Sequence, residues 1–167
     1  MRFVTVISIA SLLLLQWGCE NKEKKFYQIV GNLNASIQKG SSSSVDKDLS
    51  DFSLFIDKNK IYEDGSFLSE AGISETVSFI NCAEDYNKTL KNKNKEEDEF
   101  KRWDTNLKEM KNPLKRQALP DPEKVYDSIE QRLEKITENI RTIEVALNSR
   151  KIKCDGTYSK LVSIHKK

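Results

Sequence analysis

The apolar positions divide the chain into an N-terminal apolar run, two short amphipathic segments and two long periodic segments. Over residues 26–38 apolar side chains recur at steps of three and four, which predicts a short amphipathic helix. The cluster at residues 49–56 predicts a second short helix, and the serine-rich run before it predicts a flexible linker. We therefore expect residues 26–57 to form short helices joined by a Ser-rich linker.

A long helix is predicted over about residues 75–111. Its apolar side chains follow steps of four and three, and polar Lys93 and Glu97 lie on the same stripe. The helix is expected to end before Pro113, because proline disfavours the helical conformation of the preceding Asn112.

A second long helix is predicted over residues 122–151. Asp121 is placed to cap it, Pro122 occupies its first turn, and Glu123 lies beside its positive end. Its apolar stripe keeps heptad-type spacing and consists of Val125, Ile129, Leu133, Ile136, Ile140, Ile143 and Leu147. Such spacing indicates a helix that packs against another helix.

The first 19 residues form a separate segment. One arginine precedes a mostly apolar run over residues 3–15, and charged residues begin at Glu20. As a helix this run would be about 20 Å long, which is too short for a bilayer core. The segment therefore predicts a cleaved secretory signal, followed by a single helical domain over residues 20–167.

The cysteines predict one disulfide. Cys19 is either removed with the signal or left at the extreme N-terminus, so that Cys82 and Cys154 remain. In an oxidising compartment an even pair most simply forms one disulfide. Closing a loop of this size restricts the unfolded chain by about 4 kcal/mol in the entropy description.

The two long helices are expected to form an antiparallel hairpin, because the connection between them is short. A register that sets the two cysteines opposite each other also brings the apolar stripes together. It pairs Phe100 with Ile136 and Trp103 with Leu133, so both aromatic residues are expected in the hairpin core.

The predicted fold class is all-α. The disulfide clamps a hairpin over residues 75–154, and one or two short N-terminal helices pack against it. Gly156 is expected to help end the second helix, so that residues 155–167 form a basic tail.

Composition and motifs exclude several kinds of chemistry. The net charge is only +2, from 28 basic and 26 acidic residues, which argues against nucleic acid as a partner. His165 is the only histidine, so the usual zinc ligand sets cannot be assembled. Neither a glycine-rich phosphate loop nor a nucleophile elbow is present. The carboxylates near Glu97 favour an exposed helix, with Glu97 spaced to pair with Lys101. We therefore expect no enzyme activity and no cofactor.

Basic residues are frequent at the predicted disulfide end of the hairpin. They predict a possible contact with an anionic surface, such as a polyanionic glycan or a membrane, with a solubilising surface as the alternative. The residues are Lys88, Lys91, Lys93, Lys95, Arg150, Lys151 and Lys153.

Two sequons offer glycosylation acceptors at Asn34 and Asn87, which would be used only in a eukaryotic secretory route.

The end of the signal supports two routes of export. "LQWGC" resembles a bacterial lipobox through Gly18 and Cys19, although Gln16 and Trp17 depart from the usual aliphatic and small residues. This resemblance implies a lipidated Cys19 and a chain anchored in a bacterial envelope. The β-branched run "FVTVISIASLLLL" is similar to an arthropod secretory signal and implies release from the cell.

In its signal, size and cysteine pair the chain resembles small secreted helical salivary or venom proteins of arthropods. That resemblance implies a secreted, non-enzymatic protein that captures or modulates a host protein or mediator in haemostasis or immunity. The alternative is a bacterial envelope lipoprotein that acts as a structural partner, secretion pilot or immunity protein. Contact with a membrane is expected only if Cys19 is lipidated.

Overall fold

The computed structural model describes residues 22–63 and 66–165, and over these residues it is all-α without a strand. The predicted signal and Cys19 lie outside the described residues. The chain divides into two compact units. Unit 1 comprises the residues up to Glu84 together with those from Ile152 onward, and unit 2 comprises Asp85–Lys151. Two long helices contribute to both units: α3 (Glu70–Met110) and α5 (Pro122–His165).

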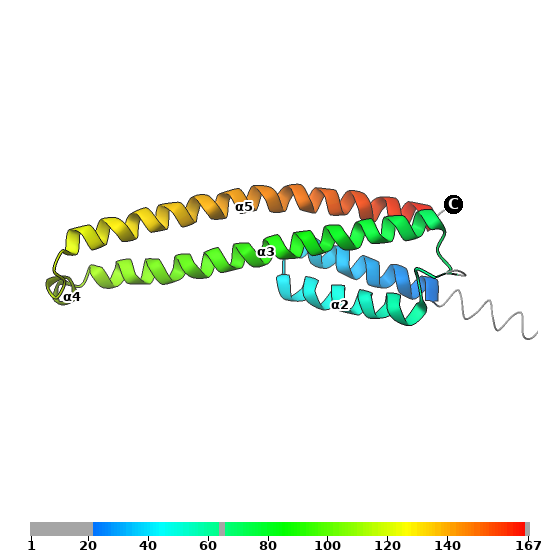
Figure 1. The fold of residues 1–167 in the computed structure, drawn as a ribbon, viewed down its shortest axis with the longest axis horizontal. Helices are drawn as coiled ribbons and strands as arrows, with labels where there is room; N and C mark the ends of the chain where they lie inside the picture. The colour runs from blue at the N-terminus through cyan, green and yellow to red at the C-terminus, as the bar shows by residue number, and fades with distance from the viewer. Residues whose placement is uncertain (1–21, 64–65, 166–167) are drawn as a thin grey trace, which may run out of the picture. The chain divides into compact units, whose positions relative to one another are not determined.

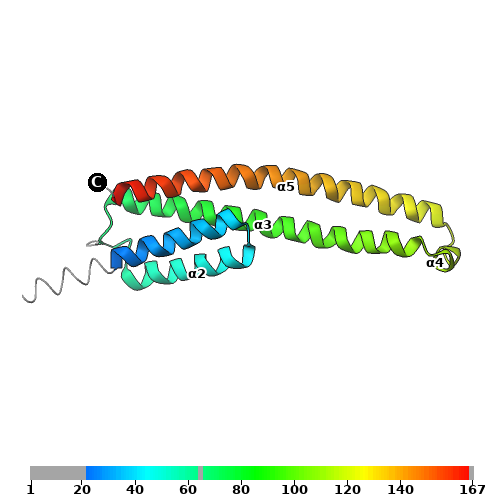
Figure 2. The same cartoon turned by 180° about the vertical axis from the view of Figure 1, so that it is seen from behind.

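Two shorter helices of unit 1, a helix over residues 22–39 and α2 (Ser42–Asn59), lie side by side (Figures 1 and 2). Only Gly40 and Ser41 separate them, so the prediction of a flexible serine-rich linker is wrong. Gly40 permits this tight turn because it adopts a left-handed φ of 72°, and its N–H reaches the carbonyl oxygen of Ser36 at 3.1 Å. The serines that follow form the start of α2, where burial of Val45 secures the first turn.

Unit 1 contains most of the fully buried side chains. Phe26 packs against the rings of Phe52 and Phe55, with centroids 5.5 and 6.2 Å apart. The first part of α3 contributes Phe79, which is fully buried and contacts the ring of Tyr158 on α5 at 5.9 Å. Unit 1 is therefore a helical bundle with a continuous apolar core.

The C-terminal part of α5 belongs to this core, which contradicts the predicted basic tail. The helix passes through Gly156 without a break and ends at His165. Leu161 is fully buried, and Tyr158 packs on Phe79. These contacts compensate for the poor helix propensity of an exposed glycine, so Gly156 does not end the helix. Helix α3 similarly begins at Glu70, earlier than predicted, and the Ser69 hydroxyl accepts a hydrogen bond from Gly72 N–H at 3.2 Å.

Unit 2 consists of the rest of α3 and α5 and of the short helix α4 (Pro113–Gln117). Three polar contacts link α3 to α5: Lys93 to Glu144 at 2.9 Å, Glu96 to Asn139 at 3.1 Å, and Glu99 to Arg132. Residue numbers rise on α3 as they fall on α5, so the two helices run antiparallel within this unit.

The apolar stripes of unit 2 are only partly buried. Tyr86, Leu90, Ile129, Ile136 and Leu147 are buried, whereas other stripe positions of both helices remain half-buried. Among the half-buried residues are Phe100, Trp103, Leu133, Ile140 and Ile143. Phe100 and Trp103 are therefore not fully enclosed core residues, contrary to the prediction.

Candidate functional site

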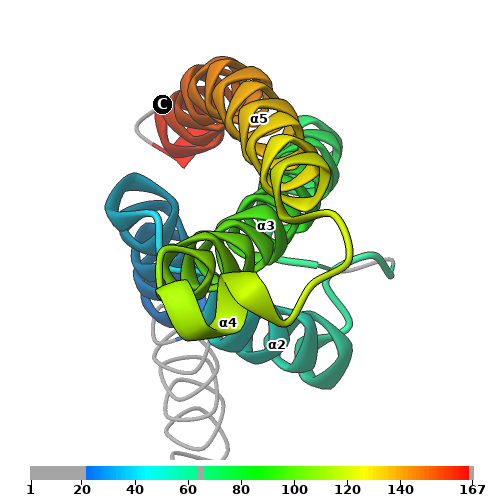
Figure 3. The same ribbon diagram turned by 90° about the vertical axis from the view of Figure 1, so that its left-hand side faces the viewer.

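The connection between α3 and α5 builds a cleft at one end of unit 2. Helix α3 ends at Met110, and the Asn112 side chain accepts a hydrogen bond from Leu114 N–H at 3.1 Å to start α4. Helix α5 then begins at Pro122, where the Asp121 carboxylate accepts a hydrogen bond from Lys124 N–H at 3.2 Å. Both helix boundaries confirm the sequence predictions. Figure 3 shows α4 lying across the direction of the two long helices.

The cleft has an apolar floor and a polar rim, with a volume of about 690 Å³. Its apolar side chains come from α3, α5 and the connection before α5, namely Trp103, Met110, Leu119, Val125 and Ile129. Polar side chains surround them, namely Asn106, Glu109, Lys115, Lys124 and Ser128. An apolar centre with a polar rim is the usual composition of a ligand pocket or of a protein-binding hot spot.

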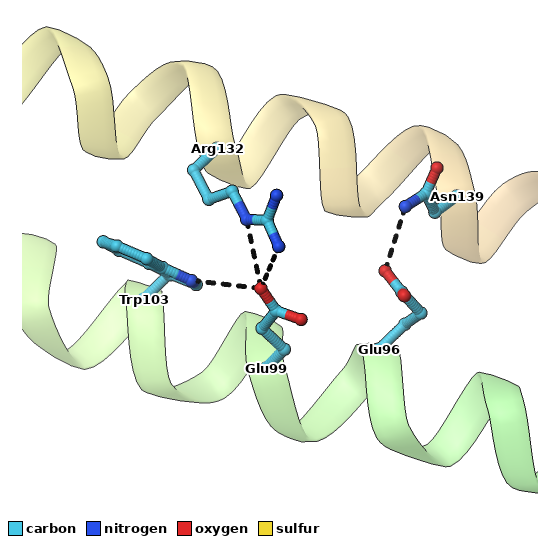
Figure 4. A network of polar contacts seen from close by, with 5 residues as sticks. All are labelled: Glu96, Glu99, Trp103, Arg132 and Asn139. Carbon is cyan, nitrogen blue, oxygen red and sulfur yellow. Dashed lines mark hydrogen bonds and ion pairs between the residues drawn. The ribbon is translucent and has the colours of Figure 1, made fainter.

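A polar network orients the side chain of Trp103 (Figure 4), which also lines this cleft. The Trp103 indole N–H donates to a Glu99 carboxylate oxygen at 3.4 Å, and Arg132 Nε donates to the same oxygen at 3.0 Å. The Arg132 guanidinium lowers the pKa of Glu99, because its hydrogen bond favours the ionised carboxylate. Glu99 therefore stays charged at neutral pH and holds both partners in place.

The rim contains Lys115, which forms an ion pair, and Lys124, for which the described residues provide no ion pair. Lys115 on α4 pairs with Glu109 on α3 at 2.8 Å, which ties α4 to the end of α3. Lys124 is exposed, and the structure gives its amine no ion pair among the described residues. The cleft can therefore accept apolar groups at its floor and one negative charge at its rim.

The predicted cysteine pair is confirmed. Cys82 on α3 and Cys154 on α5 lie at disulfide distance, with Cα atoms 5.5 Å apart. Both residues belong to unit 1 and both are buried. The bond therefore joins two elements of the same apolar core.

The two sequons differ in accessibility. Asn87 is 5% exposed on α3, so a glycan on its side chain is incompatible with the folded chain. Asn34 is half-buried on the helix over residues 22–39 and stays a predicted acceptor. Sequence alone could not separate the two, because an Asn-X-Ser/Thr motif carries no signal of burial.

The predicted anionic-surface residues lie in different environments. Lys93 forms ion pairs with Glu144 at 2.9 Å and with Glu97 at 3.3 Å, and its hydrogen bond to Glu144 raises its pKa. Lys95 lines a small hollow of unit 2. Lys88 and Lys91 are exposed, Arg150 and Lys151 are half-buried, and Lys153 is exposed in unit 1.

Sequence reasoning did not find the cleft, because its residues come from three helices and the connection before α5. Trp103 was assigned to the hairpin core on its spacing. The connection over residues 112–121 contains two leucines, Leu114 and Leu119, and the sequence does not show that only Leu119 lines the cleft.

The described residues offer neither a metal site nor a membrane span. No cluster of His, Cys, Asp and Glu there could hold a metal ion. None of the helices there is both long enough and apolar enough to cross a membrane.

The fold and the cysteine pair define the chain as an all-α protein with one disulfide-distance pair in the described residues. Comparison with family models, with curated proteins and with solved structures finds no match.

Proposed function

We propose that this chain is an exported, non-enzymatic binding protein, and that the cleft of unit 2 captures an extracellular protein partner of a host. The observation that carries the proposal is the apolar floor around an oriented Trp103. Tryptophan is the residue most enriched at binding hot spots, and a ring held in position loses little entropy on binding.

The composition of the rim favours a protein partner over an enclosed small molecule. The cleft is bordered by exposed polar side chains of α3, α4 and α5, in the manner of a protein interface with a dry centre. Apolar side chains of the partner would occupy the floor, and a partner carboxylate would pair with Lys124. The antiparallel pair of α3 and α5, as the predicted hairpin, would serve as the support that presents this cleft.

The test compares two valines of α5. Val125 lines the cleft, whereas Val145 is 68% exposed and does not line it. The bait is the chain over residues 20–167, which retains every described residue. Extracellular proteins retained by this bait are identified, and their affinities are then measured for Val125→Asp and Val145→Asp.

We expect Val125→Asp to lower the affinity for the partner by about tenfold or more, because it places a charge in an apolar contact. Val145→Asp should leave the affinity unchanged. Trp103 is the only tryptophan of this bait, so binding should also shift its emission. Equal affinities for the two variants would contradict the proposal, as would binding that leaves the Trp103 emission constant.

A second candidate is the lipid-anchored envelope protein. Burial of Asn87 leaves Asn34 as the acceptor that a eukaryotic route could use, of the two that the sequence offers. Intact mass of protein from its natural source separates the routes. A diacylglycerol mass on Cys19 supports the bacterial lipoprotein, and a hexose-rich mass on Asn34 supports the secreted effector.

A further inference from the structure

A basic and apolar face lies on unit 1 and shares no residue with the cleft of unit 2. We call it the N-terminal face and define it by Lys22, Lys25 and Ile29 of the helix over residues 22–39 and by Leu54 and Lys58 of α2. A groove of about 330 Å³ brings Lys25, Ile29, Leu54 and Lys58 together with Asp51 and Phe55. Lys22 precedes Lys25 by three positions, which places both on one side of the helix.

The packing of the two helices brings these side chains to one end of unit 1. The start of the first helix and the end of α2 lie together in Figures 1 and 2. The tilted ring contacts of Phe26 with Phe52 and Phe55 join the two helices at this end. The opposite end is tied by the Ser36 hydroxyl, which donates to the Asp48 carboxylate.

The chemistry of the N-terminal face suits an anionic membrane surface. The face contributes Lys22, Lys25 and Lys58, its groove contains one carboxylate, Asp51, and Leu54 is 64% exposed. Lysine stems can lie along the headgroup region while their amines contact phosphates, and the leucine can enter the apolar boundary. A lysine near an anionic bilayer contributes favourably, and the contributions add.

The position of the face in the chain supports the same occupant. Lys22 follows the apolar segment over residues 3–15 and Cys19 in the sequence. Lys22 lies three positions after Cys19, a reach of about 10 Å even when fully extended. A lipid on Cys19 would therefore hold the N-terminal face at the headgroups of the bilayer.

We propose that the N-terminal face is a docking surface for anionic phospholipid membranes. Docking at this surface uses unit 1 and leaves the cleft of unit 2 unused, so it does not depend on the proposed function of the cleft.

The experiment measures binding of the unlipidated chain over residues 20–167 to two kinds of vesicle. One kind contains phosphatidylcholine alone, and the other contains phosphatidylcholine mixed with phosphatidylglycerol. We expect sedimentation with the mixed vesicles only, and release as the salt concentration rises. No sedimentation with the mixed vesicles, or equal sedimentation with both kinds, would overturn the proposal.

Variants locate the surface. Lys25→Glu combined with Lys58→Glu should weaken binding by about tenfold or more, and Leu54→Asp should also weaken it. The matched control combines Lys88→Glu with Lys95→Glu, which makes the same change of charge in the basic run of unit 2. The control should keep most of the affinity.

A loss in the control as large as the loss in the face variant would overturn the proposal, because binding would then follow total charge or the other basic run. Far-ultraviolet circular dichroism of each variant, compared with the parent chain, checks that helical content is retained. If Lys25→Glu with Lys58→Glu unfolds, Leu54→Asp decides, because Leu54 is already exposed and its replacement leaves the core intact.

Discussion

Polar residues within the apolar stripes of unit 2 have specific partners. Lys93 interrupts the stripe of α3, and its amine bridges Glu97 on the same helix and Glu144 on α5. The sequence instead suggested that Glu97 pairs with Lys101, whereas Lys101 pairs with Asp98 at 3.2 Å. Glu97 pairs with Lys93, which also contacts α5, and not with Lys101. Both lysines lie four positions from Glu97, so the spacing alone cannot show which of them forms the ion pair.

Glu99 gives a pH-dependent signal at the cleft. Arg132 lowers its pKa, so the interaction stabilises the folded chain fully above the ordinary glutamate pKa of about 4.3. This contribution is lost as the pH falls through the lowered folded value. We expect the Trp103 emission of the chain over residues 20–167 to shift in that acidic range, while circular dichroism reports whether helices persist.

Two glutamine variants test this assignment. Glu99→Gln should already have the shifted emission at neutral pH and should lack the acid step, because the amide cannot be protonated in that range. Glu96→Gln is the matched control. In the parent chain the Glu96 carboxylate accepts a hydrogen bond from the neutral Asn139 side chain and not from Arg132. The acid step in the Trp103 emission should therefore persist in this variant. An acid step that survives in Glu99→Gln would assign the signal to another group.

Two glycines, Gly40 and Gly156, have different roles in the helical elements. Gly40 has a φ of 72° in the tight turn before α2, a conformation that disfavours any residue with a Cβ. Gly156 lies inside α5, and an added Cβ there would meet nothing within 4 Å. The same residue type therefore permits a turn in one place and weakens a helix in the other.

The Gly40→Ala and Gly156→Ala variants should change stability in opposite directions. Gly40→Ala should lower the free energy of unfolding by about 1 kcal/mol, because alanine is strained at positive φ. Gly156→Ala should raise it by about 1 kcal/mol, because alanine has the better helix propensity. Urea unfolding followed by circular dichroism measures both. A destabilising Gly156→Ala would show that the glycine has a packing role in this helix.

The two units of the molecule have different kinds of core. Unit 1 encloses fully buried residues from four helical segments, including Phe26, Phe52, Phe79 and Leu161, and it contains the cysteine pair. In unit 2 most stripe positions of α3 and α5 are only half-buried. Local stability rises with the number of buried apolar contacts. The free energy of local opening should therefore be larger in unit 1 than in unit 2.

Amide hydrogen exchange should therefore be slower in peptides of unit 1 than in peptides of unit 2 near residues 100–129. Replacing both Cys82 and Cys154 by serine should lower the free energy of unfolding by about 2–4 kcal/mol. Because both cysteines lie in unit 1, we expect this double substitution to reduce the protection of amides from hydrogen exchange more in unit 1 than in unit 2. Equal protection of the two units in the parent chain would contradict this view of the cores.

The sequence by itself determined the all-α class, the cysteine pair and the helix boundaries at Met110 and Pro122. These features depend on local chemistry: apolar periodicity, a proline after Asn112 and the Asp121 cap act within a few residues. Cysteine pairing followed from there being two candidates after Cys19.

Only the tertiary structure decided which apolar residues are enclosed and which stay accessible. The spacing of Leu161 and Trp103 gave no measure of their burial, yet Leu161 is fully buried in unit 1 and Trp103 lines the cleft. Burial depends on how many helices surround a position, and that number is a property of the assembled chain. The cleft and the N-terminal face also depend on the assembled chain, because each combines residues that are distant in sequence.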